Sequence, residues 1–265
     1  MASMCTVGAY ATHILLPAAE VLKLEKDDDP IDMCALPLNY MTAYGLLKRA
    51  GAKLEMGSSI LIGSVAGGVG TAMAQLVNAF DMGITMYGTC SASKFEYVKT
   101  LGVTPIDRRD PDIAARVREL TGGNGVDVAY DAVGSQKSIH AAHESTKEDT
   151  GQVICLGMMS RIKPDGSGML PVDFDVFKYI QEGRVPRASF FAVTHGYYYT
   201  QKGIFVQDFQ AVAEKVRKRM LKPVIGKLLR LSDAVEVNEM LVSGVGVQGK
   251  LEVVVDAQLA RAKNV

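Results

Sequence analysis

The sequence predicts an α/β fold: a doubly wound parallel sheet with a small partial second lobe formed by the two chain ends. Three observations lead to this prediction. Between Ser58 and Gly157, short runs rich in β-branched residues alternate with stretches of helical spacing. These runs are apolar almost throughout, which is typical of strands covered by helices on both faces. The segments before and after this region follow a different pattern.

The alternating region supplies most of the expected elements. The expected strands are residues 59–64, 83–88, 103–106, 126–131 and 152–157, with a sixth strand at 188–193. The expected helices between them are residues 69–80, 92–101, 112–120 and 136–146. A helix between two strands carries the chain back along the sheet, so the strands should run parallel.

The two ends of the chain are expected to pack together as the second lobe. Residues 8–16 and 20–24 resemble strands and stop at the acidic loop 27–30. After residue 201 we expect a helix at 206–220, a strand at 227–231, a helix after the cap Ser232 and a strand at 250–256. Residues 31–200 then form the central domain, between residues 1–30 and residues 201–265. The loops of residues 158–201, rich in glycine, proline and aromatic residues, are the least predictable part.

Composition excludes several classes of protein. The chain has 265 residues, with 29 Lys plus Arg and 29 Asp plus Glu, so no global field would attract nucleic acid or an anionic membrane. Its four cysteines form no C-x-x-C pair, which argues against a zinc site and favours a reducing compartment. No apolar run is long enough to span a bilayer, and no signal-like segment opens the chain. We expect a cytoplasmic protein that binds no metal, nucleic acid or membrane.

A glycine-rich loop leaves the first expected strand and enters the helix that follows. It reads Gly63-Ser64-Val65-Ala66-Gly67-Gly68-Val69-Gly70. Glycines let the backbone turn tightly and approach a pyrophosphate, which the N–H groups and the positive dipole end of the helix then bind. A glycine cluster alone is also consistent with a structural turn. The strand–loop–helix setting favours a Rossmann dinucleotide-binding domain.

The loop after the second expected strand lacks an acidic residue. An NAD site usually has Asp or Glu about 20 residues after the glycines, to hold the ribose 2′-hydroxyl. Here the sequence is Gly88-Thr89-Cys90-Ser91-Ala92-Ser93-Lys94, and Arg108 and Arg109 follow the third strand. Two serines and a lysine suit a 2′-phosphate, although these cations are also consistent with a merely solubilising role. The loop therefore predicts NADPH rather than NADH.

Segments along nearly the whole chain resemble the medium-chain dehydrogenase/reductase superfamily, specifically its zinc-free quinone oxidoreductase branch. The matching segments are residues 39–47, 66–70, 119–134, 221–226 and 249–251. The resemblance implies an NADPH-binding Rossmann domain at residues 31–200. It also implies that residues 1–30 are the remnant of a GroES-like catalytic domain, to which residues 201–265 return.

The resemblance also implies a set of cofactor-binding residues. The phosphate-binding slot is Ser64-x-x-Gly67-x-x-Gly70, which includes Gly68 and Val69. Lys94 falls on the family's 2′-phosphate lysine, with Ser91 beside it, and Arg108 falls where relatives carry a ring residue beside the adenosine phosphate. The positions that line the nicotinamide half are Thr42, Val133, Gly157 and Phe191. Lys250 is a further expected cofactor contact.

Two departures from the family concern the catalytic side. Relatives begin about a hundred residues earlier, with a small domain that covers the nicotinamide and forms half of the substrate cleft. Loss of that cover should lower turnover more than cofactor binding, because hydride transfer depends on positioning and on stabilising the developing charge. Related alkenal reductases also carry a tyrosine five residues after the equivalent of Gly157, where this chain has Ile162.

Tyrosines supply the candidate catalytic groups. Tyr44 and Tyr40, on a helix leading into the cleft, carry hydroxyls that could protonate a forming enolate or quinol oxygen; solvent is the third candidate donor. The alternative for either tyrosine is core packing with a satisfied hydroxyl. Residues 197–199, three consecutive tyrosines, are equally consistent with ordinary packing and with the aromatic wall of a substrate pocket.

These observations predict an NADPH-dependent reductase of quinones or α,β-unsaturated carbonyls. One alternative is a non-redox cyclase or lyase of a biosynthetic intermediate that uses the same fold and cleft, with a new pocket in residues 158–199. Another is an NADPH-binding protein without turnover. We also expect a homodimer formed by edge pairing of the strand at 188–193, because an unpaired apolar sheet edge must be covered.

Overall fold

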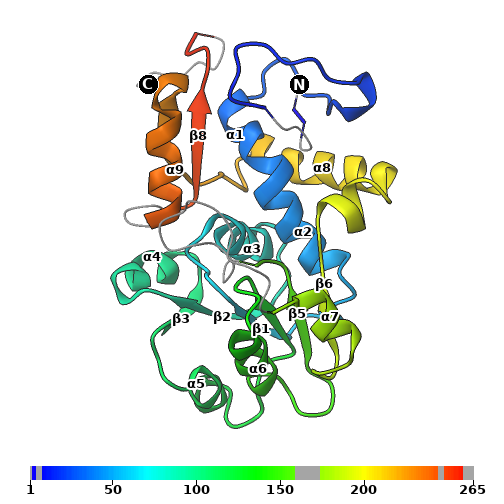
Figure 1. The fold of residues 1–265 in the computed structure, drawn as a ribbon, viewed down its shortest axis with the longest axis vertical. Helices are drawn as coiled ribbons and strands as arrows, with labels where there is room; N and C mark the ends of the chain where they lie inside the picture. Colours follow the sequence, from blue (N-terminus) through cyan, green and yellow to red (C-terminus); the bar gives the residue numbers. More distant parts are fainter. Residues whose placement is uncertain (1, 4–7, 159–173, 244–247, 259–265) are drawn as a thin grey trace.

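The computed structural model describes residues 2–3, 8–158, 174–243 and 248–258 (Figure 1). Its main body is a six-stranded sheet with strand order β3-β2-β1-β4-β5-β6, in which every neighbouring pair is parallel. The strands are β1 (Ser59–Ile62), β2 (Thr85–Cys90), β3 (Val103–Asp107), β4 (Val128–Asp131), β5 (Gln152–Cys155) and β6 (Ala188–Phe190). The expected doubly wound parallel sheet is confirmed.

Helices cover both faces of this sheet. The helices of the first face are α2 (Met41–Lys48), α3 (Gly68–Ala79) and α4 (Phe95–Thr100), and those of the second are α5 (Ile113–Leu120), α6 (Gln136–Glu144) and α7 (Val176–Gln181). Helix α8 (Lys202–Arg217) packs against α2 and the turn before it rather than on the sheet. Strand β1 shows why two cores form. Ile60 and Ile62 belong to the first core and Leu61 to the second, because alternate strand side chains point to opposite faces.

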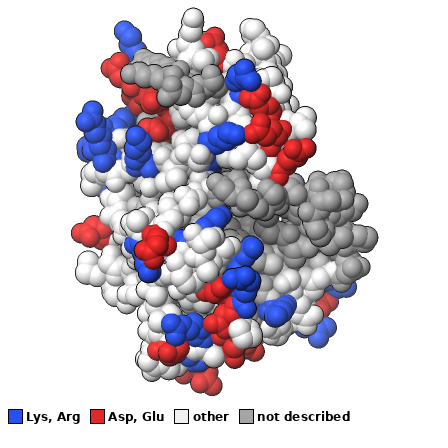
Figure 2. All heavy atoms as spheres, turned by 90° about the vertical axis from the view of Figure 1, so that its left-hand side faces the viewer, with Lys and Arg blue, Asp and Glu red and all other residues white. Residues whose placement is uncertain are grey.

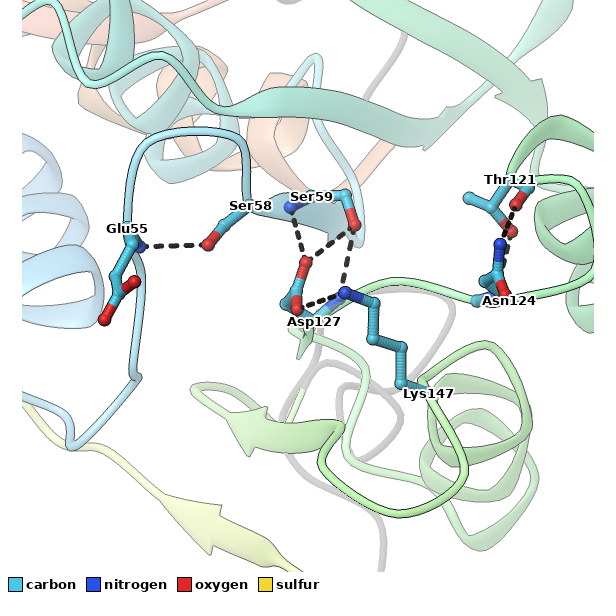
Figure 3. Close-up of polar contacts among 8 residues, drawn as sticks. Glu55, Ser58, Ser59, Thr121, Asn124, Asp127 and Lys147 are labelled. Atoms are coloured by element: carbon cyan, nitrogen blue, oxygen red, sulfur yellow. Dashed lines mark hydrogen bonds and ion pairs between the residues drawn. The ribbon is translucent and has the colours of Figure 1, made fainter.

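The starts of β1 and β4 are fixed by one carboxylate at the amino edge of the sheet. Asp127 accepts hydrogen bonds from the backbone N–H and the hydroxyl of Ser59, at 2.8 and 3.0 Å (Figure 3). Its second oxygen lies 2.7 Å from the ammonium of Lys147. This cluster fixes the register of the two central strands.

A smaller lobe contains a second sheet of two parallel strands, β7 (Ile225–Arg230) and β8 (Lys250–Val254). The chain between them includes the helix α9 (Ala234–Ser243), and α1 (Pro30–Ala35) lies near β8 (Figure 1). Arg217 of α8 forms a bidentate pair with Asp28, with both N–O distances 2.8 Å, so the N-terminal segment is held against α8. The two chain ends therefore lie on the same side of the main sheet.

The strands expected near the N-terminus are wrong. Residues 8–16 form turns and irregular backbone, residues Ala18–Glu20 form a 3-10 turn, and residue 22 makes only an isolated bridge to residue 2. The physical reason is that residues 8–16 pair with no strand in the part of the chain that the structure describes, and the side chain of Leu15 stays 97% exposed. An alternating pattern without a partner strand does not form a sheet.

Two elements differ from the sequence prediction in smaller ways. Strand β2 begins at Thr85 rather than at Gly83, whose φ of +61° turns the chain just before the strand. Helix α7 is an additional element, capped by the carboxylate of Asp175, which accepts from the N–H groups of Phe177 and Lys178. Ile162, together with the rest of residues 159–173, lies outside the described residues.

Candidate dinucleotide-binding site

The glycine loop between β1 and α3 is closely packed against the sheet. A Cβ atom at Gly70 would lie 2.5 Å from Cα of Val65 and 2.7 Å from its carbonyl oxygen, so only glycine fits there. A Cβ atom at Gly63 would lie 2.8 Å from the carbonyl oxygen of Tyr130 in β4. Ser64 turns the chain with a φ of +55°. The loop therefore draws the start of α3 onto the carboxyl ends of β1 and β4.

The first turn of α3 faces outward without a side-chain cap. Gly67 occupies the N-cap position and has no side chain with which to accept from the N–H groups of the turn. A Cβ atom at Gly67 would meet only the carbonyl oxygen of Ser64, at 3.2 Å, so here the glycine leaves one side of the turn open. Unpaired N–H groups at the positive end of a helix of twelve residues form a phosphate site. These residues fit the pyrophosphate of a dinucleotide.

A pocket of about 380 Å³ adjoins this turn at the carboxyl edge of the sheet. Its wall on the sheet side is formed by the ends of β1 to β4, and its opposite wall by α6. Residues that line it include Gly63, Ser64, Thr89, Arg108, Asp131 and Val133. A pocket of this size with a few polar groups on apolar walls suits a nucleoside.

The ends of β2 and β3 bring basic groups toward this pocket. The backbone N–H of Arg108 donates to the carbonyl of Cys90 at 2.8 Å, so the two loops are adjacent. Ser91 accepts from the backbone N–H of Lys94 at 2.9 Å, and burial raises the pKa of the Cys90 thiol while the charge of Lys94 opposes that rise. Arg109 turns away from the pocket to pair with Asp107. Of the expected cations, Arg108 therefore lines the pocket, and Lys94 lies near Cys90 at the end of β2.

Asp131 orders the loop after β4. Its carboxylate is 5% exposed and accepts from the N–H groups of Val133 and Gly134, at 3.1 and 2.9 Å, and from the hydroxyl of Ser138. Burial raises its pKa, although these hydrogen bonds act in the opposite direction. A Cβ atom at Gly157 would lie 2.5 Å from the carbonyl of Ala132, so the ends of β4 and β5 are in backbone contact. Val133 and Gly157 are thereby held at one edge of the site.

The other residues expected at the nicotinamide half are buried. Thr42 lies in the first turn of α2 and is 7% exposed. The backbone N–H of Phe191 donates to the carbonyl of Cys155 at 2.8 Å, and its ring packs toward α2, where Gly45 leaves room for it. The backbone of Phe191 therefore extends the pairing of β6 with β5, while its ring points toward α2.

The three consecutive tyrosines pack mainly into the core. The hydroxyl of Tyr197 donates to Asp208, which is also paired with Arg49, and the hydroxyl of Tyr198 donates to Glu20. Both rings are fully buried, whereas Tyr199 is half exposed. The packing interpretation therefore holds for Tyr197 and Tyr198.

The structure does not bring the candidate catalytic tyrosines to the open turn of α3. Tyr40 is buried, and its hydroxyl donates to Gln75 and accepts from the N–H of Val224. Burial raises its pKa far above the ordinary tyrosine range. The ring of Tyr44 packs edge-on against Phe80, 5.5 Å between centroids, beyond the last turn of α3. Burial also raises the pKa of Tyr44.

Lys250 begins β8, where its N–H donates to the carbonyl of Val224 at 2.9 Å. Its charge acts on the buried carboxyl of Glu252, whose pKa burial raises to about 7. The structure therefore places Lys250 in the smaller lobe. Val224, whose carbonyl accepts from Lys250, also donates its own N–H to the hydroxyl of Tyr40.

Three further observations concern other kinds of site. Within the described ranges, no three His, Cys, Asp or Glu side chains are grouped so as to hold a metal ion. Among the helices placed in the structure, none combines the length and the apolar composition required to cross a bilayer. On the face drawn in Figure 2, basic and acidic side chains are interspersed, which is unlike the continuous basic stripe of a nucleic-acid interface.

Sequence reasoning missed two residues that shape the site, Thr89 and Asp131. The signal for Asp131 was its place as the last residue of a buried strand, at the edge where ligands of parallel sheets bind. Thr89 holds the glycine loop, because its hydroxyl accepts from the N–H of Ser64 at 3.2 Å. That contact depends on the pairing of β1 with β2, which a single sequence does not reveal.

Comparisons with known proteins agree with this geometry. A family described as zinc-binding dehydrogenase matches residues 68–198. The synaptic vesicle membrane protein VAT-1 homolog of Rattus norvegicus is 33% identical over 152 residues, which cover 57% of this chain and 36% of that protein. A 2-haloacrylate reductase of Burkholderia sp is 39% identical over 140 residues, 50% of this chain and 41% of that enzyme. The chain thus spans about two fifths of the length of these curated relatives.

Solved structures share the fold over most of the chain. A mycobacterial protein complexed with NADPH has a TM-score of 0.74 at 24% identity, covering 94% of this chain and 72% of its own. A quinone oxidoreductase of Pseudomonas syringae pv. Tomato DC3000 has a TM-score of 0.70 at 26% identity, covering 91% and 69%. Together the fold, the glycine loop and these relatives support a quinone oxidoreductase-like protein of the medium-chain dehydrogenase/reductase superfamily.

Proposed function

We propose that the protein is an NADPH-dependent reductase of quinones or α,β-unsaturated carbonyls. The observation that carries the proposal is the acid-free end of β2. Ser91 and Lys94 lie there, in the sequence position where an NAD site has a carboxylate. This end adjoins both the pocket of about 380 Å³ and the open turn of α3. The NADPH named for the mycobacterial neighbour is consistent with such a site.

Each part of the site has its own role in this proposal. The N–H groups at the start of α3, from Gly68 to Gly70, bind the pyrophosphate, with Gly67 and Ser64 shaping the approach. Lys94 and Ser91 bind the 2′-phosphate through charge-assisted hydrogen bonds, and Arg108 lies over the adenosine. The loops at Val133 and Gly157, with Thr42 and the backbone of Phe191, bound the nicotinamide half. Lys250 supplies positive charge from the smaller lobe.

The bound NADPH supplies a hydride to an electron-poor carbon of the substrate. Substrates of this kind are supported by the 2-haloacrylate reductase and quinone oxidoreductase among the similar proteins. The oxygen that gains charge then needs a proton. Tyr40 already donates its hydroxyl to Gln75, and Tyr44 lies beyond the other end of α3. We therefore assign the proton to solvent, the third candidate.

We extend the proposal to the assembly and the setting of the protein. Strand β6 is an edge of the main sheet, and we propose that two copies pair through it as a homodimer. The described cysteines, Cys34, Cys90 and Cys155, are free thiols, which supports a cytoplasmic setting. We further propose that residues 1–30 and 201–265 form one lobe over the central domain, as the pair of Arg217 with Asp28 suggests.

Loss of NADPH absorbance on addition of substrate tests the function. The panel contains 1,4-benzoquinone, an enone and 2-chloroacrylate, each with NADPH or NADH at equal concentration. We expect the wild type to oxidise NADPH faster than NADH. At subsaturating NADPH, Lys94→Ala should oxidise NADPH more slowly than the wild type. Product without cofactor consumption would support a cyclase or lyase instead. Tight NADPH binding without turnover on any substrate would support a binding protein.

A further inference from the structure

The side chain of Asn39 lies directly over the first residue of α3. A Cβ atom at Gly68 would come within 2.3 Å of Nδ2 and 3.0 Å of Cγ of Asn39. The absence of a side chain at Gly68 is therefore what admits the amide of Asn39 to this place. The first turn of α3 is also where the proposed function binds the pyrophosphate. The amide thus adjoins the N–H groups that would hold that anion.

The backbone around Asn39 holds it in this position. Residues Leu36–Tyr40 form a π-helical turn between α1 and α2, a rare geometry that often accompanies functional sites. Pro37 of this turn is buried, and so is Tyr40, which is fixed by hydrogen bonds to Gln75 and Val224, whereas Leu38 is exposed. Asn39 itself is half-buried. Fixed neighbours leave its side chain little freedom to move away from Gly68.

Among the described residues, no group pairs with the side-chain amide of Asn39. Its side chain forms no hydrogen bond within the part of the chain that the structure describes, whereas the amide of Gln75, on the adjacent helix α3, both accepts from Tyr40 and donates to Lys222. A primary amide offers two N–H donors. Donors beside the uncapped start of a helix are suited to an anion rather than to a cation.

We infer that Asn39 is a cofactor-binding residue that donates a hydrogen bond to the pyrophosphate of the dinucleotide. The inference rests on the proposed function and adds a donor from outside the glycine loop. Because NADPH and NADH share the pyrophosphate, Asn39 contributes to the affinity for both. Lys94, by contrast, contributes only where a 2′-phosphate is present. This difference separates the two roles in one experiment.

The experiment measures dissociation constants for NADPH and NADH by calorimetry, without substrate. Asn39→Asp keeps the size of the side chain but replaces the donor with a negative charge, and Asn39→Ala removes the donor alone. We expect Asn39→Asp to weaken both nucleotides by about tenfold or more, and Asn39→Ala by somewhat less, because hydrogen bonds to charged groups are the strong ones. The ratio of the two constants should stay that of the wild type. Inorganic pyrophosphate, as a competitor, should also lose affinity.

Asn124→Asp is the matched control. Asn124 is exposed in the loop before β4, at the opposite edge of the sheet, and its amide donates to the carbonyl of Thr121 at 3.1 Å (Figure 3). Unchanged nucleotide affinity in both folded Asn39 variants would overturn the inference, as would a changed NADPH-to-NADH ratio. Wild-type protein that binds neither nucleotide would instead overturn the proposed function, and the inference with it. Thermal unfolding of each variant verifies that it is folded.

Discussion

Substitution of Gly70 by alanine tests the packing of the glycine loop directly. The added Cβ atom would lie 2.5 Å from Cα of Val65, 2.7 Å from its carbonyl oxygen and 2.8 Å from the carbonyl of Ser64. All three contacts are with backbone, so no side chain can rotate away, and α3 must move off β1 by about 1 Å to reach an ordinary contact distance. Overpacking of this kind costs about 1–3 kcal/mol. We expect the melting temperature to fall by roughly 4–8 °C for a loss of about 2 kcal/mol.

Gly67→Ala provides the contrast. Gly67 has a φ of −82°, and its Cβ atom would meet only the carbonyl of Ser64, at 3.2 Å. The free energy of unfolding of the variant should therefore lie within about 1 kcal/mol of that of the wild type, because this is the cost of alanine at an N-cap. Its added methyl group should nevertheless weaken NADPH binding, because it stands at the open turn. Differential scanning fluorimetry and calorimetry measure the two effects separately. Equal stability losses in the two variants would refute the reasoning.

Three other expectations follow from the structure. Lys94→Ala should reduce the preference for NADPH over NADH from at least tenfold, or about 1.4 kcal/mol, toward unity; calorimetry that finds equal affinities in the wild type would contradict it. Light scattering should report a dimer, and a charged substitution at Ser189 in β6 should yield monomers; a wild-type monomer at working concentrations would exclude this interface. Burial raises the pKa of Glu252 to about 7, above its unfolded value of 4.5, so the folded state favours the protonated carboxyl. The stability that the protonated carboxyl contributes to the folded state is complete below the unfolded pKa of 4.5 and is lost as the pH rises to about 7. Glu252→Gln should therefore gain stability relative to the wild type between pH 5 and pH 8, by up to about 3 kcal/mol, and a constant difference in urea unfolding would disprove it.

The central sheet could be predicted from sequence because its strands have both faces buried. Runs such as Ile60-Leu61-Ile62 are apolar on every residue, and only a covered parallel sheet accommodates that pattern. The N-terminal strands could not be predicted correctly, because residues 8–16 carry an alternating pattern with no partner strand among the described residues. Helix α7 carried a usable signal in Asp175, a good N-cap ahead of an apolar stretch, but it lies in a segment dominated by loop residues.

In the candidate site, too, residues of a local motif could be predicted and residues that depend on tertiary contacts could not. Gly67, Gly70 and Lys94 could be proposed from the sequence because the phosphate chemistry imposes a local spacing on the chain. Residues that act through distant contacts were not found in this way. Thr89 supports Ser64 from the neighbouring strand, and Asn39 reaches Gly68 from a helix almost thirty residues earlier. Such contacts depend on tertiary packing, which a local motif does not encode.

The two halves of the site differ in how tightly the fold constrains them. The proposed cradle for the pyrophosphate is fixed by close backbone packing, since a Cβ atom at Gly70 would clash with Val65 and one at Gly63 with Tyr130. A side chain at Gly63 or Gly70 would have to displace a strand or a helix, so this part of the loop is preorganised before a cofactor binds. The end of β2, by contrast, presents the partly exposed side chains of Ser91 and Lys94 on a 3-10 turn. Under the proposed function, single substitutions at that turn should therefore change the choice of cofactor at little cost in stability, while dinucleotide binding is retained.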